Sequence, residues 1–218
     1  MDDASERLSR TIWVGVGLTV VLLCVAIVMS RVKDRNAAAD SLPVIGTVAD
    51  FALTDQHGKT VTLADLRGRV WVADIIFTRC AGPCPRMTGQ MESLQNALPK
   101  NSRARLVSLT TDPDFDTPEV LNKYASRFNA DPERWSFLTG DKKQIAALAI
   151  DSLKLTAIEK DEADRENPQD LFIHSTIFVV VDKQARLRGV FETTGDDIDW
   201  PAIQAAILAA VKTLESAR

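Results

Sequence analysis

An apolar run from Val70 to Phe77, VWVADIIF, constrains the fold of this chain more than any other stretch. Its β-branched residues and near absence of polar positions predict a central strand covered on both faces. The loop FTRCAGPCPRM follows directly and contains Cys80 and Cys84, and PRMTGQMESLQNAL then has the apolar spacing of a helix. A strand buried on both sides and followed by a helix predicts an α/β fold with helices on both faces of a sheet.

The rest of the chain continues this alternation of strands and helices. ADFALTD, QHGK and TVTL predict an N-terminal β-hairpin around a glycine turn. Further expected elements are a buried strand over Arg105–Thr111, a helix over 117–128 with Asp116 or Thr117 as N-cap, a helix over 141–150, a solvated charged loop over 159–170, a strand–turn–strand over 175–192 and an amphipathic helix over 198–214. We therefore expect a three-layer α/β sandwich.

Thr11–Ser30 precedes this domain and runs for twenty residues without a charged side chain. At about 1.5 Å per residue, a helix of this length crosses a hydrocarbon core of roughly 30 Å. A cleaved signal peptide is the alternative, with Ala37-Ala38-Ala39 as its cleavage site, but the apolar run is longer than usual for one. The sequence predicts a tail over 1–10, one membrane anchor over 11–30, a polar linker over 31–43 and a folded domain over 44–218.

Charge excludes one class of partner but leaves the orientation of the anchor open. The net charge is -4, and the absence of a basic cluster argues against nucleic acid as a partner. Arg7 and Arg10 precede the apolar run, whereas Arg31, Lys33 and Arg35 follow it, so the positive-inside rule does not decide the orientation. Large domains translocate largely regardless of charge, so the folded domain can lie outside the cytoplasm.

Cys80 and Cys84 are the only cysteines outside the apolar run, where Cys24 lies. Without a disulfide framework, stability has to come from a packed core. Pro85 fits the first turn of the following helix and biases Cys84 away from helical backbone angles, while Gly82 allows the loop a positive φ. The residue pattern alone leaves three alternatives open: a buried structural pair, a redox pair or a metal site.

Charges near the cysteine loop predict reactive sulfurs. Both cysteines are expected near the positive end of the helix dipole, and Arg79 and Arg86 flank them. Such surroundings favour the thiolate, which is both the nucleophile and the metal ligand.

Two histidines are available as a further ligand. His57 lies in the polar turn QHGK and is expected to be a turn residue. His174 stands at the entrance to the buried strand IFVVV, where a thioredoxin fold brings the chain past its cysteine loop. The residues themselves leave His174 as either a metal ligand or a structural side chain.

Four segments together resemble the Sco family of membrane-anchored copper proteins, also called SenC or PrrC. They are FTRCAGPCP, SLTTDPDFDTPEVLNKY, WSFLTG and HSTIFVVVD, and the likeness runs from about Val48 to the C-terminus and includes the anchor. The resemblance implies a thioredoxin-like fold, a copper site formed by Cys80, Cys84 and His174, and an extracytoplasmic domain. It also implies delivery of copper to the binuclear copper centre of cytochrome c oxidase, or reduction of the cysteines of that centre.

The chemistry of these side chains agrees with the implied metal. Two thiolates and an imidazole suit Cu(I), whereas a structural zinc site normally has a fourth protein ligand. Many relatives carry an aspartate before the histidine, where this chain has Ile173. Asp112 either supplies a carboxylate to the site from another strand end or caps its own loop. Met87 and Met91 follow Cys84 at helical spacing and are expected to pack in the core.

Two functions from different classes follow. The first is a copper metallochaperone whose partner is the copper-centre subunit of cytochrome c oxidase or another copper or thiol protein. The second is a thiol:disulfide oxidoreductase in which Cys80 attacks a target disulfide and Cys84 resolves the mixed disulfide. The spacing of three residues between the cysteines, where thioredoxins have two, and His174-Ser175-Thr176 in place of a Thr-Pro favour the first.

Overall fold

The computed structural model describes residues 2–40, 42–159, 172–195 and 197–217. Residues 42–215 form the folded domain, and the N-terminal helix belongs to a separate unit. Of the charged loop expected over 159–170, all but Glu159 lies outside the described ranges.

The N-terminal helix α1 extends over Asp2–Asp40. Its segment Val16–Asp34 has a mean hydropathy of 2.1 over 19 residues, which is long and apolar enough to cross a membrane. The helix continues through the region expected to be a linker, because neither glycine nor proline occurs between Arg31 and Asp40 to end it. The next helix breaker in the sequence is Pro43.

The folded domain is built on an eight-stranded sheet with the order β1-β10-β9-β4-β5-β6-β2-β3. The three central strands β4, β5 and β6 are parallel, and their neighbours pair antiparallel. A separate antiparallel pair joins β7 (Ala157–Glu159) to β8 (Phe172–His174). The strands of the large sheet are β1 (Gly46–Thr47), β2 (Ala52–Asp55), β3 (Thr60–Thr62), β4 (Trp71–Ile76), β5 (Arg105–Thr110), β6 (Trp135–Thr139), β9 (Ile177–Val181) and β10 (Arg186–Glu192).

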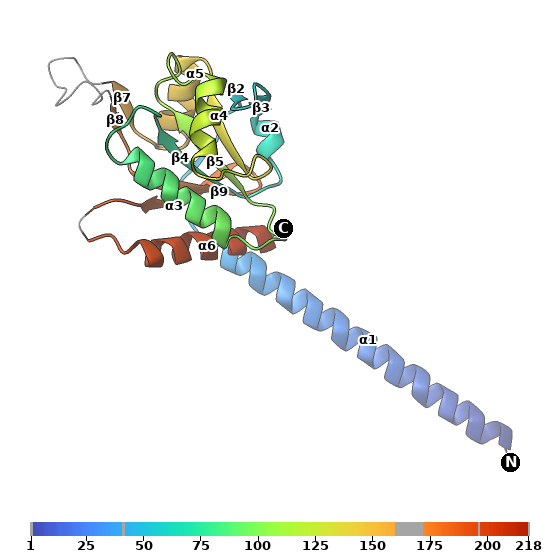
Figure 1. Cartoon of the computed structure of the whole chain (residues 1–218). Coiled ribbons are helices and arrows are strands. Elements are labelled where there is room, and N and C mark those ends of the chain that lie inside the picture. Colours follow the sequence, from blue (N-terminus) through green and yellow to red (C-terminus); the bar gives the residue numbers. More distant parts are fainter. Residues whose placement is uncertain (1, 41, 160–171, 196, 218) are drawn as a thin grey trace. The chain divides into compact units, whose positions relative to one another are not determined.

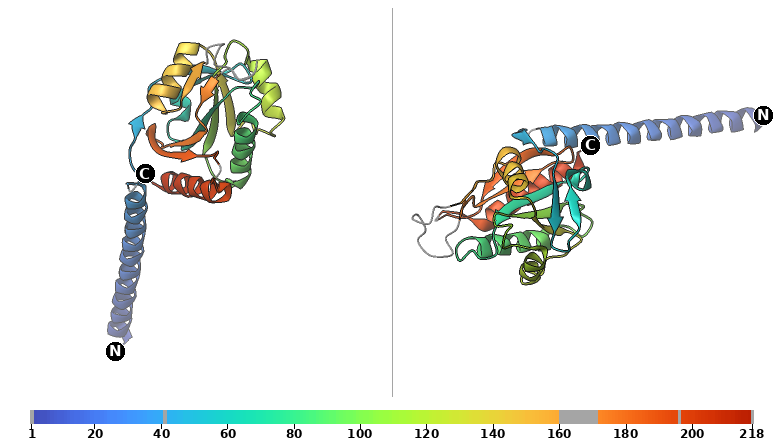
Figure 2. Two further views of the ribbon diagram at one scale, coloured as in Figure 1. Left: turned by 90° about the vertical axis from the view of Figure 1, so that its left-hand side faces the viewer. Right: turned by 90° about the horizontal axis from the view of Figure 1, so that it is seen from above.

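Helices cover both faces of the sheet, as predicted (Figures 1 and 2). One face carries α3 (Cys84–Ala97), α4 (Pro118–Ser126) and α6 (Trp200–Ser216). The other face carries α2 (Leu63–Leu66), α5 (Lys142–Ala146) and the π-helical turn η1 (Ala147–Ser152). The prediction of a three-layer α/β sandwich with an N-terminal β2–β3 hairpin is confirmed.

The central strand β4 is buried at every position, which confirms the prediction from its apolar run. Its side chains alternate between the two faces. Trp71, Ala73 and Ile75 join the cluster that includes Leu148 of η1. Val72, Asp74 and Ile76 therefore face the layer of α3, α4 and α6.

Helix α3 packs through Met87 and Met91, which are both 0% exposed, so their predicted core role is confirmed. Replacing such a buried methionine with alanine costs about 2–5 kcal/mol of stability. The helix ends at Ala97, and Leu98 caps it by donating its N–H to the carbonyl of Leu94, after which Pro99 follows. At α4 the predicted cap is also found, because Thr117 Oγ1 accepts from the amide of Val120 at 3.4 Å.

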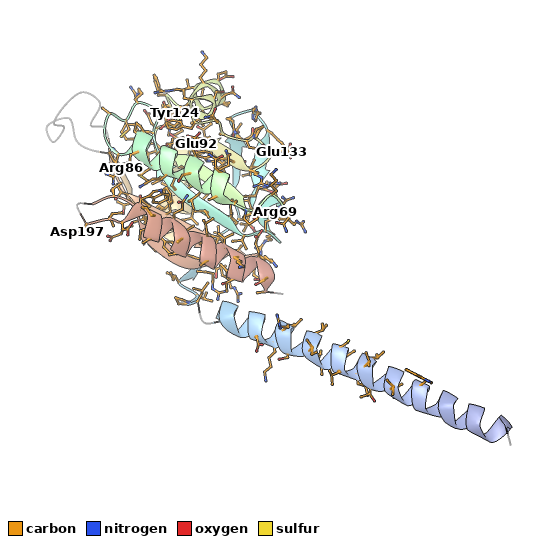
Figure 3. All side chains as sticks on the ribbon, turned by 60° about the horizontal axis from the view of Figure 1, so that its bottom comes forward. Arg69, Arg86, Glu92, Tyr124, Glu133 and Asp197 are labelled. Carbon is orange, nitrogen blue, oxygen red and sulfur yellow. The ribbon has the colours of Figure 1, made fainter. Side chains whose placement is uncertain are left out.

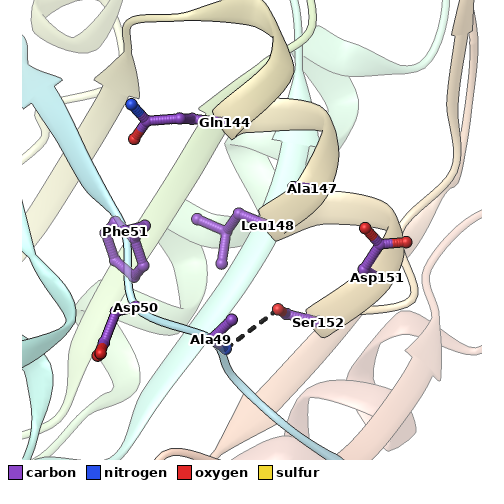
Figure 4. A pocket seen from close by; sticks show the side chains of 8 residues that line it. All are labelled: Ala49, Asp50, Phe51, Gln144, Ala147, Leu148, Asp151 and Ser152. Atoms are coloured by element: carbon purple, nitrogen blue, oxygen red, sulfur yellow. Dashed lines mark hydrogen bonds between the residues drawn. The ribbon is translucent and has the colours of Figure 1, made fainter.

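The helix expected over 141–150 is divided, since α5 is followed by the wider η1 turn. A pocket of about 150 Å³ lies where η1 meets the chain segment that enters β2 (Figure 4). Across it, the amide of Ala49 donates to Ser152 Oγ at 3.2 Å. The π turn thus ties the entering chain to the α5 face of the sheet.

A buried ion pair fixes the start of the folded domain. Arg188 on β10 donates to Asp182 Oδ2 at 2.7 Å, and both side chains are 3% exposed. The same guanidinium donates to the carbonyl oxygens of Leu42 at 2.6 Å and Pro43 at 3.2 Å. Burial by itself raises the pKa of Asp182, but hydrogen bonds from the amide and side chain of Arg186 and from Arg188 outweigh it, so this pKa lies below its ordinary value.

We predict that Asp182→Asn lowers the free energy of unfolding at pH 7 by about 3–5 kcal/mol, because it leaves a buried arginine without its counter-charge. The carboxylate has a depressed pKa in the folded state, so its contribution is present above the unfolded pKa of about 3.9 and is lost as the pH falls through the folded value. The difference between parent and variant should therefore shrink below about pH 4. Urea unfolding of the full chain in detergent measures it.

Asp151→Asn is the matched control, because this carboxylate is exposed. A parent and an Asp182→Asn variant with equal stability at pH 7 would contradict the proposed role of the ion pair.

Candidate functional site

The cysteine loop connects the carboxyl end of β4 to the first turn of α3. Cys80 is 9% exposed and Cys84 is 0% exposed, so both sulfurs are recessed. The loop turns back at once, because the amide of Cys80 donates to the carbonyl of Phe77 at 3.2 Å. The carboxyl end of a central strand in an open α/β sheet is where such folds place their sites.

Backbone amides hold both sulfur atoms. The amide of Phe77 donates to Cys84 Sγ at 3.5 Å, and that of Gly82 donates to Cys80 Sγ at 3.3 Å. The two thiols also hydrogen-bond to each other, and no disulfide joins them. The loop therefore brings together the two cysteines that the sequence singled out.

Two local predictions about this loop are wrong. Gly82 is not among the described residues with positive φ, because the reversal is made by the Phe77–Cys80 turn and by Pro83 with helical angles of φ -74 and ψ -22. Cys84 itself begins α3, although a proline follows it. Pro85 then occupies the first turn, where its missing N–H leaves no helical hydrogen bond unmade.

The predicted stabilisation of the thiolate is also wrong for Cys84. Burial raises the pKa of its thiol, and the hydrogen bond and charge of Cys80 and the charge of Asp74 raise it further. The two arginines do not reverse this, since Arg86 points outward from the start of α3 (Figure 3) and Arg79 pairs with an aspartate.

Three polar side chains lie behind the cysteines, and the sequence analysis missed them. Asp74 is 0% exposed on the face of β4 toward α3. Thr88 Oγ1 donates to the carbonyl of Cys84 at 2.8 Å and lies 2.9 Å from the hydroxyl of Tyr124. Burial raises the pKa of Tyr124, and the charges of Cys84 and Asp74 add to the effect. The signal for Asp74 was visible, because it is the one carboxylate in VWVADIIF.

Asp116 connects the cysteine loop to the neighbouring strand. It is 0% exposed, and its carboxylate accepts from the amide of Thr78 at 3.1 Å and from the hydroxyl groups of Thr78 and Thr110. Burial raises the pKa of Asp116, although these hydrogen bonds oppose the shift in part. The sequence offered Asp116 only as one of two N-cap residues, whereas the structure assigns the cap to Thr117.

Asp112 forms an ion pair with Arg79. Its Oδ2 accepts from Arg79 Nε at 3.1 Å and also from Nη2. Its backbone carbonyl accepts from the amide of Asp116 at 2.8 Å, which closes the turn between β5 and α4. The Arg79 guanidinium stacks 4.2 Å from the ring centroid of Phe115 in the same turn. Asp112 thus supports the cysteine loop through the side chain next to Cys80.

The two histidines are far apart in the sequence and differ in setting. His57 lies in the β2–β3 turn, as predicted, with Nδ1 3.2 Å from the side-chain amide of Asn122. His174 ends β8 opposite Ala157. The backbone of His174 is described but its side chain is not, and among the described side chains no three of His, Cys, Asp and Glu gather to hold a metal.

The backbone path nevertheless brings His174 to the functional edge of the sheet. Strand β9 runs antiparallel to β4 with Ala73 opposite Val179, so the start of β9 lies at the end where β4 finishes. The β7–β8 hairpin, which ends three residues before β9, extends from the same end of the domain as the start of α3 (Figures 1 and 2).

Parallel strands β4, β5 and β6, an antiparallel β9–β10 ribbon and a dithiol at the β4–α3 junction define a thioredoxin-like protein. The family model SCO1/SenC matches residues 41–209. The chain therefore belongs to the SCO1/SenC family.

Individual relatives agree with this assignment. The SCO1 protein homolog of Bacillus subtilis is 35% identical over 188 residues, which cover 84% of this chain and 90% of the relative. A structure of BsSco, described as having a disulfide switch and as a member of the Sco family of cytochrome c oxidase assembly proteins, is 31% identical with a TM-score of 0.64 and covers 79% of this chain and 96% of its own.

A homologue has also been solved with copper bound. The copper-bound ScoI of Bradyrhizobium japonicum has a TM-score of 0.61 and 24% identity, covering 75% of this chain and 99% of its own. At that identity, the likeness to this chain is one of fold.

We predict that Asp116→Asn loosens the cysteine loop, because an amide side chain cannot accept at both of its terminal atoms. The free energy of unfolding should fall by about 1–3 kcal/mol. Hydrogen exchange at the amide of Thr78 should accelerate, while exchange in the centre of β5 changes only with global stability.

Asp114→Asn in the same turn is the control, because Asp114 is exposed. Equal exchange at Thr78 in the parent and in Asp116→Asn would contradict the role assigned to this carboxylate.

Proposed function

We propose that this chain is a membrane-anchored metallochaperone that carries copper for the assembly of cytochrome c oxidase, with Cys80, Cys84 and His174 as the copper ligands. The recipient is the binuclear copper centre of the oxidase. The observation that carries the proposal is the pair of hydrogen-bonded thiols at the β4–α3 junction of a chain in the SCO1/SenC family.

The donor chemistry of the described residues fits copper as cargo. Thiolate sulfur is a soft donor and prefers Cu(I) among the metals available to proteins. Copper bound to the two cysteine sulfurs can take one further ligand from the protein. With only three protein ligands, the ion keeps an open coordination position and can be exchanged. An exchangeable site is what a carrier requires, since it has to release its cargo.

The path of the chain supports His174 as the third ligand. Its strand β8 precedes β9, which begins at the edge of the sheet where the cysteine loop lies. His57 has no such support, because it lies in the β2–β3 turn and contacts Asn122.

Thiol:disulfide exchange is a second candidate function, and the unequal burial of the two sulfurs favours it. Cys80 is partly accessible and Cys84 is fully buried. In this reaction the Cys80 thiolate attacks a target disulfide, and Cys84 then displaces the mixed disulfide, so the target gains two electrons and two protons as the Cys80–Cys84 disulfide forms.

Among the described residues, one helix is long and apolar enough to cross a membrane, which supports a one-span anchor with the folded domain outside the cytoplasm. Val16–Asp34 is long enough to cross a bilayer. Delivery to an extracytoplasmic copper centre requires the domain to lie on that side.

We predict that anaerobic titration of the full chain in detergent gives one Cu(I) per chain when Cys24 is replaced by serine in every variant. Cys80→Ser and Cys84→Ser should each weaken Cu(I) binding by more than about 100-fold. This exceeds the loss of about 10–100-fold that follows when a residue that only hydrogen-bonds to a metal ligand is removed. His174→Ala should weaken it clearly, and His57→Ala should leave it unchanged.

A His174→Ala variant that binds Cu(I) as tightly as the parent would refute the ligand set. If the same protein also reduced insulin disulfides at rates typical of thioredoxins, thiol:disulfide exchange would become the better assignment.

The orientation is tested separately by labelling intact cells with a membrane-impermeant maleimide. Because Cys80 and Cys84 are recessed, single cysteines should be introduced at exposed or terminal positions in a chain whose own three cysteines are serine. We expect Asp114→Cys to be labelled and Ser5→Cys to be protected until the cells are lysed. The opposite pattern would place the folded domain in the cytoplasm and exclude the proposed recipient.

A further inference from the structure

Phe115 is exposed at the rim of the cysteine loop. Its side chain is 43% exposed, and among the described side chains of residues 42–217 it is the only aromatic residue in the exposed class. It lies between Asp114 and Asp116. The side chain of Asp116 is buried, whereas the ring of Phe115 faces solvent. A single exposed apolar side chain is normal on a protein surface, so what distinguishes Phe115 is its position beside the cysteine loop.

The ring is held in place with respect to the cysteines. Arg79, the residue before Cys80, stacks on it at 4.2 Å, and Arg79 is in turn paired with Asp112. The neighbouring Asp116 hydrogen-bonds to Thr78 on the loop. Two independent links thus connect the Phe115 turn to the cysteine loop.

Any acceptor of copper has to touch this rim. Cys84 is 0% exposed and Cys80 only 9%, so a ligand from another protein reaches the sulfurs only when its surface covers the loop. Aromatic and arginine side chains dominate the binding energy of protein interfaces. Beside the cysteine loop, Phe115 is such an aromatic side chain and Arg79 is such an arginine.

We propose that Phe115, with Arg79 stacked on it, is the docking contact for the thiol-bearing protein that accepts copper from Cys80 and Cys84. This inference rests on the proposed copper-transfer function. The partner should present an apolar depression for the ring beside its own two thiol ligands. During transfer copper stays Cu(I), and each bond from copper to a sulfur of this chain is replaced by a bond to a partner sulfur. The bond from copper to His174 breaks as the ion leaves, which gives Cu(I) held by two sulfurs of the partner. The protons lost by the partner thiols are balanced by protonation of Cys80 and Cys84.

The test measures copper transfer from the Cu(I)-loaded full chain in detergent to the reduced, copper-free soluble domain that carries the binuclear copper centre of cytochrome c oxidase. Phe115→Ala should lower the second-order rate of transfer by about 30-fold, the effect of removing an interface hot spot. Its Cu(I) affinity and its unfolding midpoint should match those of the parent. Phe115→Trp should restore transfer.

Ile150→Ala is the matched control, because Ile150 is 42% exposed and lies on η1, on the other face of the sheet. Its transfer rate should equal that of the parent. Transfer by Phe115→Ala at the parental rate would overturn the docking role while leaving copper transfer intact. A Phe115→Ala variant that loses Cu(I) affinity in proportion to its rate would also overturn it, because the ring would then act on the copper site. A parent that binds or transfers no Cu(I) would refute the proposed function together with this inference.

Discussion

The position of the cysteine loop depends on the hydrogen bonds that the buried carboxylate of Asp116 accepts. It is the acceptor that joins Thr78 of the cysteine loop to Thr110 at the end of β5, so one side chain fixes the distance between two adjacent strand ends. Burying a carboxylate is costly unless donors surround it, and here a backbone amide and two hydroxyl groups do so. The same arrangement directs Phe115 outward and lets Arg79 reach Asp112. The geometry of the cysteine loop therefore depends on these polar contacts in addition to the apolar core.

Two opposing electrostatic effects act on the sulfur of Cys84, and their sizes decide the outcome. A helix N-terminus stabilises a nearby negative charge by about 0.3–1 kcal/mol, or about 2 kcal/mol in favourable partly buried geometry. Full burial shifts a pKa by up to several units, each of about 1.4 kcal/mol, in the direction of the neutral form. Burial, the hydrogen bond and charge of Cys80 and the charge of Asp74 therefore prevail, and the pKa of the Cys84 thiol lies above its ordinary value. A bound cation with thiolate ligands would supply the positive charge that the protein itself does not place there.

The domain is also anchored internally at the point where the chain enters it. Arg188 joins the carbonyl groups of Leu42 and Pro43 to Asp182, and Ser152 of the π turn accepts from Ala49. These contacts order the first residues of the domain directly after the chain leaves α1.

The amino-acid sequence alone was enough to predict the family, the three-layer class of fold, the central strand, the helix after the cysteines and the core positions of Met87 and Met91. The family follows from the resemblance of four motif segments, and the other features follow from runs of apolar residues and from short-range spacing along the chain. Three other features became visible only in the folded domain: the raised pKa of Cys84, the pairing of Arg79 with Asp112 and the hydrogen bonds that Asp116 accepts from Thr78 and Thr110. Each of these joins residues that are distant in sequence, and a local pattern cannot report how deeply a sulfur is buried or which of several arginines meets a carboxylate. The ligand role of His174 stays a prediction, since the sequence and the strand order bring its backbone to the right edge of the sheet but a metal bond is decided by the direction of its ring.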